Sequence, residues 1–337
     1  MATAVTLSLS SLGLLVLTRW GVGLAANMAF FFRRSGVRRY LDVKPNAGAS
    51  AKESWALITG SSAGLGRALA FELAGLGFNI VLHGSNAAKL EAVKEELQAA
   101  HPSRSVRTLV LDARICGLLN GADLEAKLNA AVKSLDDIHI RILVNNVGMP
   151  QARPEVRAPF DALDTFTYDE LLLNVAGNAV FPMLFTRALY PQLIRNQPAL
   201  VINMGSLAAE GFPLFPSYGP AKAFLMASTV ELRLENRIEG RDIEVLGIDV
   251  AGVTGTDTIQ DKPNLMLPDA PTYAKYVVRS IGCGHARVAP YLPQAIFLWV
   301  IRSLPSWLGD SVKASMLKGM REEAVTKMKN GDTSGIR

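Results

Sequence analysis

Short apolar runs alternate with longer segments of helical periodicity from residue 55 onward. Such alternation predicts a parallel β-sheet with helices on both of its faces, which is the doubly wound α/β class. Strands are expected at residues 55–59, 79–83, 108–112, 141–145, 199–203 and 243–250. Helices are expected at residues 65–74, 86–100, 123–134, 168–195 and 218–239, with Asn86 as an N-cap.

The chain is long enough to bury a full core, because 49% of its 337 residues are hydrophobic. We expect a membrane anchor and basic linker at residues 1–52, one α/β domain at 53–290 and an apolar or amphipathic tail at 291–337. Residues 149–165 and 254–270 are rich in proline and turn formers, so they are candidate loops around a substrate entrance.

Positive charge is concentrated near the N-terminus. The net charge is +5, yet the first 52 residues alone carry +6, so the remaining 28 basic and 29 acidic residues give −1. A nucleic-acid-binding protein would spread basic residues over its folded surface. Basic residues that follow an apolar segment indicate a membrane partner instead, and no nucleic acid is expected. The lysines and arginines among the first 52 residues are Arg19, Arg33, Arg34, Arg38, Arg39, Lys44 and Lys52.

Two runs without charged side chains, residues 1–18 and 20–32, flank Arg19. A helix needs about 20 apolar residues to cross a bilayer, and the two runs together exceed that length if Arg19 lies at an interface. The arginines after Phe32 are expected to stay in the cytosol, so the folded domain would face the cytosol. A cleaved signal peptide and a peripheral amphipathic helix are the alternatives.

A second apolar run, residues 295–301, is too short to cross a bilayer. It has two interpretations of about equal weight. It lies on the membrane or lines an apolar substrate entrance, or it is an ordinary core helix.

Cysteine and histidine content indicates neither a disulfide framework nor a metal centre. Two cysteines are few for a secreted, disulfide-stabilised protein, so reduced thiols are expected. The four histidines lack the spacing of metal ligands, and no metal site is expected. These residues are Cys116, Cys283, His83, His101, His139 and His285.

A glycine-rich segment, TGSSAGLG at residues 59–66, follows the first expected strand and precedes a helix. Glycines permit a tight turn and let backbone amides approach a pyrophosphate at the helix N-terminus. Any tight strand-to-helix turn can contain glycines, but the TGxxxGxG spacing is more specific than GxGxxG. The expected cofactor contacts here are Gly60, Ser62, Gly64, Leu65 and Gly66.

Tyr218 and Lys222 are four residues apart, which places them on one face of a helix. Pro220 is tolerable only in a first helical turn, so Tyr218 should stand at the helix entrance. A ketone that accepts hydride needs a proton on its oxygen, and a phenol can supply it if its pKa of about 10 is lowered. The ammonium group of Lys222 would lower the pKa of Tyr218 by favouring the phenolate.

The glycine-rich segment and the later Tyr218–Lys222 pair, in this order along the chain, resemble the motifs of the short-chain dehydrogenase/reductase family. The resemblance covers about residues 53–260. The resemblance implies a Rossmann-type catalytic domain at 53–290 and an NAD(P)-dependent oxidoreductase. It also implies that Lys222 binds the nicotinamide ribose, that Ser206 hydrogen-bonds the substrate oxygen and that Asn174 holds a water in a proton relay. The implied catalytic residues are Asn174, Ser206, Tyr218 and Lys222.

The same resemblance extends the cofactor site. An Asp that ends strand three contacts the adenine in this family, and Asp112 fits that position. Residues 145–148, NNVG, match the family's NNAG motif. The implied contacts from these and later segments are Asp112, Asn146, Gly148, Tyr218, Lys222, Val253 and Thr256.

The choice between NAD and NADP depends on the end of strand two, residues 83–86 (HGSN). An acid there would bind the ribose hydroxyls, and an arginine would receive a 2′-phosphate, yet neither is present. The side chains of Ser85, Asn86 and His83 could hydrogen-bond a 2′-phosphate. Arg67 adds positive charge nearby. We therefore expect NADP(H), with NAD(H) as the alternative.

Three departures from the family pattern concern fine geometry. Ser206 precedes Tyr218 by twelve positions where thirteen is usual. Gly205 replaces a common serine, and Ala251-Gly252 stands where Pro-Gly is usual.

Within the family, the apolar N-terminus and residues 145–149 and 304–307 resemble the endoplasmic-reticulum very-long-chain 3-oxoacyl-CoA reductases. Relatives of these, the 17β-hydroxysteroid dehydrogenases of types three and twelve, look alike here. The resemblance implies reduction of a lipophilic ketone, foremost a 3-oxoacyl-CoA of fatty acid elongation, at the cytosolic face of that membrane. Alternatives are a hydroxysteroid, polyketide or terpenoid alcohol dehydrogenase and a non-catalytic NADP-binding subunit of a membrane complex. A homodimer is left open.

Overall fold

The computed structural model describes residues 13–15, 18, 21–22, 30–31, 33–41, 53–148, 160–256, 259 and 261–329. Most of the expected anchor, the first part of the 149–165 loop and the last residues of the tail lie outside this range.

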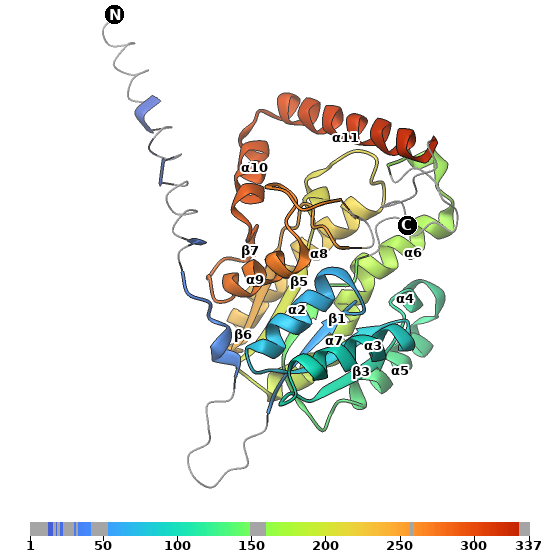
Figure 1. Cartoon of the computed structure of the whole chain (residues 1–337), viewed down its shortest axis with the longest axis vertical. Helices are drawn as coiled ribbons and strands as arrows, with labels where there is room; N and C mark the ends of the chain where they lie inside the picture. Colours follow the sequence, from blue (N-terminus) through green and yellow to red (C-terminus); the bar gives the residue numbers. More distant parts are fainter. Residues whose placement is uncertain are drawn as a thin grey trace, which may run out of the picture.

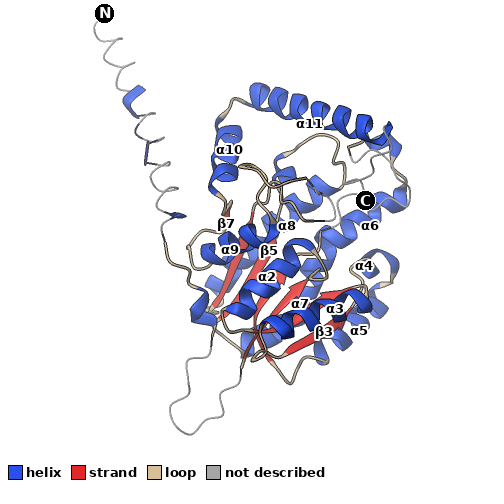
Figure 2. Ribbon diagram, viewed as in Figure 1, coloured by secondary structure: helices blue, strands red, loops and turns tan. Residues whose placement is uncertain are grey.

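A single parallel sheet of seven strands forms the centre of the molecule, in the order β3-β2-β1-β4-β5-β6-β7 (Figures 1 and 2). The doubly wound α/β class is confirmed. Six strands were expected, and the missed β7 is only two residues long, too short for a periodicity. The strands are β1 (Ser54–Thr59), β2 (Asn79–Gly84), β3 (Val106–Val110), β4 (His139–Asn145), β5 (Ala199–Met204), β6 (Ile243–Ile248) and β7 (Arg287–Val288).

Helices cover both faces of the sheet, which explains why its central strands are buried throughout. One face packs on α2 (Gly64–Gly75), α3 (Ala87–Ala100) and α9 (Ala270–Ser280). The other packs chiefly on α5 (Gly121–Lys133) and α7 (Phe181–Arg195). The remaining helices of the domain are α4 (Ile115–Leu118), α6 (Tyr168–Val175) and α8 (Tyr218–Ile238).

The expected helix at 168–195 is continuous but changes its winding in the middle. A π-helical turn, η3 (Ala176–Val180), joins α6 to α7. Among the described residues, Tyr168–Arg195 is the one helical stretch long and apolar enough to cross a membrane, and half of its most apolar 18-residue window is buried in the protein. Phe181, Phe185 and Leu189 are fully buried against the sheet, so the α7 part of this stretch is a core helix.

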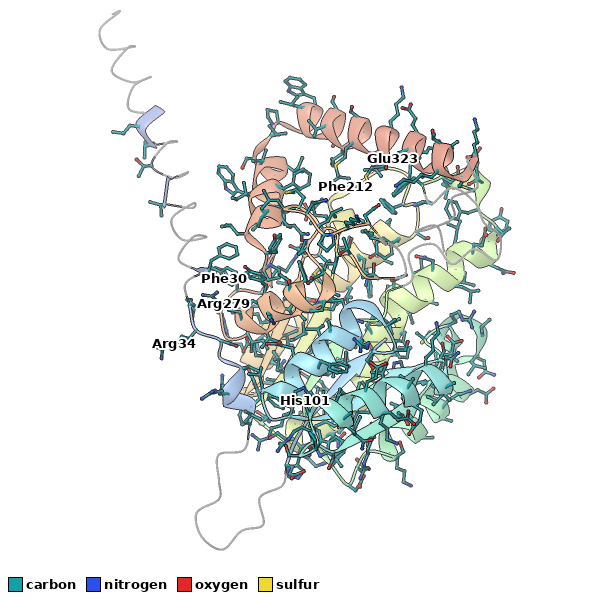
Figure 3. All side chains as sticks on the ribbon, viewed as in Figure 1. Phe30, Arg34, His101, Phe212, Arg279 and Glu323 are labelled. Atoms are coloured by element: carbon teal, nitrogen blue, oxygen red, sulfur yellow. The ribbon has the colours of Figure 1, made fainter. Side chains whose placement is uncertain are left out.

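Residues 33–41 of the expected linker pack against the α/β domain. The Arg33 guanidinium donates to the carbonyls of Cys283 and Gly282 at 2.8 and 3.1 Å, and Tyr40 donates to Glu244 at 2.5 Å. Figure 3 shows Phe30 and Arg279 on this same flank, where Arg279 Nε donates to the Arg33 carbonyl at 3.4 Å. Residues 33–41 are therefore fixed against the α/β domain.

Two C-terminal helices, α10 (Leu292–Ser303) and α11 (Ser306–Lys329), pack over the carboxyl edge of the sheet (Figure 1). Leu298 and Leu317 are buried in a cluster with Leu207 and Phe212. The run at 295–301 is thus a helix with one face in the core, while Ile296 and Val300 on its other face are exposed.

Candidate active site

The TGSSAGLG segment forms the turn between β1 and α2. Gly60 and Gly64 have positive φ angles of 65° and 54°, which side chains rarely adopt. A Cβ atom at Gly66 would lie 2.2 Å from the Gly60 carbonyl oxygen and 2.5 Å from Asn146 Nδ2. The turn is a close-packed cradle at a helix N-terminus, and these residues fit the pyrophosphate of a dinucleotide.

Asn146 joins this turn to the end of β4. Its side-chain Nδ2 donates to the carbonyls of Thr59 and Gly60 at 3.0 and 3.2 Å. Its backbone N–H and that of Val147 both donate to the Thr59 hydroxyl, at 2.9 and 3.1 Å. Asn146 therefore holds the cradle in its conformation.

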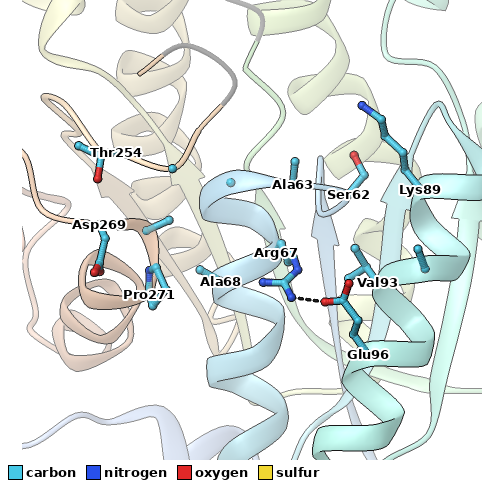
Figure 4. Close-up of a pocket in the computed structure, with 14 residues that line it drawn as sticks. Ser62, Ala63, Arg67, Ala68, Lys89, Val93, Glu96, Thr254, Asp269 and Pro271 are labelled. Carbon is cyan, nitrogen blue, oxygen red and sulfur yellow. Dashed lines mark hydrogen bonds and ion pairs between the residues drawn. The ribbon is translucent and has the colours of Figure 1, made fainter. Parts of the chain in front are cut away.

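A hollow of about 470 Å³ opens beside the cradle, between α2, α3 and the segment that leads into α9 (Figure 4). Ser62 and Gly64 line it, and Thr254 and Gly255 close its far side. Thr256 also approaches the cradle, since a Cβ at Gly64 would lie 3.3 Å from its Cγ2. The segments after β1 and β6, both expected to contact cofactor, thus meet here.

The ends of β2 and β3 differ in detail from the expectation. Asn86 caps α3, as predicted, by accepting a hydrogen bond from the Lys89 backbone N–H at 3.0 Å. Asp112 lies two residues beyond β3. Its carboxylate accepts from the Arg114 backbone N–H at 2.9 Å and pairs with the Arg114 guanidinium at 2.7 Å. Ser85 is exposed beside Asn86.

The expectation that His83 helps to bind a phosphate is wrong. Its side chain is fully buried and stacks on Phe181, with ring centroids 5.4 Å apart. Burial lowers its pKa to about 4. The β-strand alternation turns this ring into the core, away from the cofactor cradle.

Tyr218 is the first residue of α8, as Pro220 predicted. The residue as a whole is half-buried, and its hydroxyl hydrogen-bonds with Ser206. Lys222 is 2% exposed, and its Nζ donates to the Met204 and Val147 carbonyls at 3.0 and 3.4 Å. Nζ lies 5.7 Å from the centroid of the Tyr218 ring. Three of the four expected catalytic side chains, those of Ser206, Tyr218 and Lys222, therefore lie together at the carboxyl ends of β4 and β5.

The two departures around Ser206 are accommodated. The hydrogen bond between Ser206 and Tyr218 forms across a spacing of twelve residues. A Cβ at Gly205 would lie 2.7 Å from the Met226 sulfur and 3.0 Å from the Ile248 carbonyl oxygen, so the usual serine would require Met226 to move.

Asn174 is buried in the last turn of α6, immediately before the π-helical turn. Its carbonyl and its Oδ1 accept from Asn178 Nδ2 at 2.9 and 3.2 Å. Asn178 is a residue that the sequence argument missed, and a Cβ at Gly148 would lie 3.9 Å from its Oδ1 and 3.6 Å from Lys222 Nζ. Asn178 lies within the π-helical turn, and such a turn has no sequence signature here.

The segment that follows β6 is fixed from the C-terminal helix α10. Gln294 is fully buried, donates to the Gly252 and Met266 carbonyls at 2.7 and 3.0 Å and accepts from the Ala251 N–H at 3.3 Å. Val253, an expected cofactor contact, is buried directly after this clamp. Gln294 belongs to the expected C-terminal tail, so the tail fixes the segment after β6 that lines the site.

Comparison with known proteins agrees with this geometry. The family model described as short chain dehydrogenase matches residues 54–264. The chain belongs to the short-chain dehydrogenase family. It is therefore an oxidoreductase that works with a nicotinamide cofactor, as the motifs predicted.

Several relatives with similar sequences are named very-long-chain 3-oxoacyl-CoA reductases. A very-long-chain 3-oxoacyl-CoA reductase of Pyricularia oryzae is 31% identical over 284 residues, which cover 82% of this chain and 81% of that protein. One of Caenorhabditis briggsae is 29% identical over 289 residues, or 85% of each chain.

Solved structures of short-chain dehydrogenases share the fold. A 7β-hydroxysteroid dehydrogenase superimposes with a TM-score of 0.64 at 16% identity, covering 79% of this chain and 97% of that one. A short-chain dehydrogenase from Sphingobium yanoikuyae in complex with NADPH gives 0.58 at 20% identity, with coverages of 75% and 96%. At these identities the likeness establishes the fold alone.

The electrostatics of the Tyr218–Lys222 pair differ from the expectation. Burial raises the pKa of Tyr218, and the hydrogen bond with Ser206 opposes that rise only in part. Burial also lowers the pKa of Lys222 to about 8. Tyr218 and Lys222 alone therefore do not give a phenol of lowered pKa.

Because Lys222 is buried, we expect the free energy of unfolding of the protein to change with pH. Lowering the pKa of Lys222 from 10.5 to about 8 corresponds to about 3 kcal/mol against folding at pH 7, where the ammonium must be buried. Lys222→Met removes that cost but also loses two hydrogen bonds from a charged donor, worth about 1.5 kcal/mol each, so the variant should be about as stable as the wild type at pH 7.

Between pH 8 and 10.5 the unfolded lysine still holds its proton while the folded one does not, so the wild type gains stability. The wild type should therefore become progressively more stable than Lys222→Met through this window. Urea unfolding of both proteins without added nucleotide, from pH 7 to 10, measures it. A difference in unfolding free energy that stays constant with pH would contradict the prediction.

Proposed function

We propose that this protein is an NADPH-dependent reductase of long-chain 3-oxoacyl-CoA. The observation that carries the proposal is the name shared by relatives that match more than four fifths of the chain. The close approach of Ser206, Tyr218 and Lys222 at the sheet edge supports reduction of a ketone, because it gathers a proton donor and a cation at one place.

Each catalytic side chain has a role in this proposal. The bound nicotinamide cofactor supplies the hydride, and its ring is positively charged once oxidised. The hydroxyls of Ser206 and Tyr218 bind the ketone oxygen, and Tyr218 gives its proton to that oxygen as the negative charge develops. Lys222 holds the nicotinamide ribose and stabilises the phenolate that remains. Asn174, beside Asn178, holds the water through which Tyr218 regains a proton.

The cofactor contacts follow the segments at the sheet edge. We assign the pyrophosphate to Gly60, Ser62, Gly64, Leu65 and Gly66, the adenosine end to Ser85, Asn86 and Asp112, and the nicotinamide end to Asn146, Gly148, Val253 and Thr256. NADPH is favoured over NADH because β2 ends without an acid that would repel a 2′-phosphate.

The surroundings of Tyr218 suit an acyl chain. A hollow of about 550 Å³ lies between the segment before α8 and residues 161–163, and it is lined chiefly by apolar side chains such as Leu163, Phe212, Leu214 and Phe215. In the loop held by Gln294, Leu265 is 74% exposed and Met266 40% exposed, so they are available to an apolar ligand.

A substrate panel tests the proposal. Purified protein is assayed for NADPH and NADH oxidation with long-chain 3-oxoacyl-CoA, a 17-ketosteroid and an aromatic polyketide ketone. We expect kcat/KM to be highest for the acyl-CoA with NADPH, by at least about 100-fold over the other ketones. A preference for the steroid or the polyketide ketone would overturn the substrate class, and no turnover of any ketone would favour a non-catalytic subunit.

We also place the protein at the endoplasmic-reticulum membrane, with its catalytic domain in the cytosol, on the strength of the apolar N-terminal sequence and its arginines. Deleting residues 1–29 keeps the packed segment 33–41 and should move the protein from the membrane pellet to the soluble fraction. Thermal unfolding of the truncated protein serves as the folding control. Retention in the pellet by a truncated protein of unchanged melting temperature would show that another surface holds the membrane.

A further inference from the structure

The end of β2 is the place where this fold distinguishes NADP from NAD, and here it carries no charge of its own. The strand ends at Gly84, and the Ser61 backbone N–H in the cradle donates to the His83 carbonyl at 3.0 Å. A Cβ at Gly84 would lie 3.7 Å from the Ser62 hydroxyl oxygen. The Ser62 hydroxyl is therefore beside the point where a 2′-phosphate would arrive.

Lys89 lies one turn further along, in the first turn of α3, and its exposed side chain lines the same hollow as Ser62 and Gly64 (Figure 4). A cation in the first turn of a helix is opposed by the helix dipole, which favours an anion there. The first turn of α3 contains no acidic residue. Lys89 is thus placed where a bound anion would offset an otherwise unfavourable charge.

The other charged side chains of the hollow are already engaged. Arg67 pairs with Glu96, and its guanidinium lies 4.5 Å from the centroid of the Phe71 ring (Figure 4). Asp269 caps α9 by accepting from the Thr272 N–H at 2.7 Å. Among the described residues, no ion pair or side-chain hydrogen bond occupies the Lys89 ammonium.

We propose that Lys89 recognises the 2′-phosphate of NADPH and replaces the arginine that is missing at the end of β2. The Ser62 and Ser85 hydroxyls would add hydrogen bonds to the same phosphate. This assignment rests on the proposed NADPH preference and names the residue that produces it. A charge-assisted hydrogen bond to phosphate is worth about 10- to 100-fold in affinity.

Binding of NADP⁺ and NAD⁺ to the full-length protein, followed by titration calorimetry without a ketone, tests the assignment. Lys89→Ala should weaken NADP⁺ binding about 10- to 100-fold and leave the affinity for NAD⁺ unchanged. Lys94→Ala is the matched control, because Lys94 lies on the same helix, pairs with Glu91 and does not line the hollow. It should leave both affinities at the wild-type values.

The outcomes separate this inference from the proposed function. If the wild type prefers NADP⁺ and Lys89→Ala keeps that preference, Lys89 is not the determinant although NADPH remains the cofactor. Equal weakening of both nucleotides would also overturn the assignment, as would loss of the preference with Arg67→Ala but not with Lys89→Ala. A wild type that prefers NAD⁺ refutes the NADPH preference itself, and the role of Lys89 with it.

Discussion

Replacing Tyr218 with phenylalanine should lower kcat for ketone reduction about 1000-fold and leave cofactor affinity near the wild-type value. The substitution removes one oxygen, the only group at this position that can give a proton to the developing alkoxide. General acid catalysis of this kind contributes about 100- to 10,000-fold. The ring remains packed beside Phe215, with centroids 6.0 Å apart, so the fold should be retained.

Single-turnover NADPH oxidation measures the chemical step of this variant directly. Tyr168→Phe is a suitable control, because Tyr168 is 93% exposed on α6 and should tolerate the change without effect. Equal rates for wild type and Tyr218→Phe would refute the role of Tyr218 as proton donor. A melting temperature of Tyr218→Phe lowered by more than a few degrees would instead show that the loss of activity results from a folding defect.

The parts of the fold that were predictable are those encoded over short stretches. The six longer strands and the entrance of α8 at Tyr218 follow from local periodicity and from the constraints of Pro220. The cradle glycines were predictable for the same reason, because backbone conformation at Gly60 and Gly64 is set within one turn.

Features that depend on distant contacts were not predictable. His83 was expected near the cofactor, but the ring's direction depends on which sheet face receives Phe181 and Phe185. Gln294 is polar within an apolar helix, and its function appears only when the segment after β6 lies against it. The lowered pKa of Tyr218 was inferred from spacing to Lys222, whereas burial dominates both groups.

The C-terminal helices show the same limit at a larger scale. Arg302 of α10 and Arg287 of β7 both bind Glu210 and the buried Asp249, and Lys313 of α11 donates to the Glu210 carbonyl at 3.1 Å. Glu210 ends the short turn that begins after Ser206. The C-terminal helices therefore hold the segment that follows Ser206.

The second large effect is expected from Gly66→Ala, a change of one methyl group. The new Cβ would lie 2.2 Å from the Gly60 carbonyl oxygen, where contacts below 3.0 Å essentially never occur, and 2.5 Å from Asn146 Nδ2. Gly60 is fixed at a positive φ, and Asn146 holds the carbonyls of Thr59 and Gly60, so neither neighbour can move without opening the cradle.

Overpacking of this kind costs about 3 kcal/mol, which corresponds to a melting temperature lower by about 5 °C for a chain of this size. Because the cradle is also the proposed pyrophosphate site, NADPH affinity should fall at least about 100-fold, as calorimetry would measure. Gly319→Ala is the matched control: it lies in α11 with open space around the new Cβ and should raise stability slightly through helix propensity. Wild-type NADPH affinity in Gly66→Ala would mean that the dinucleotide does not approach the backbone at this turn, and the cofactor assignment built on it would fail.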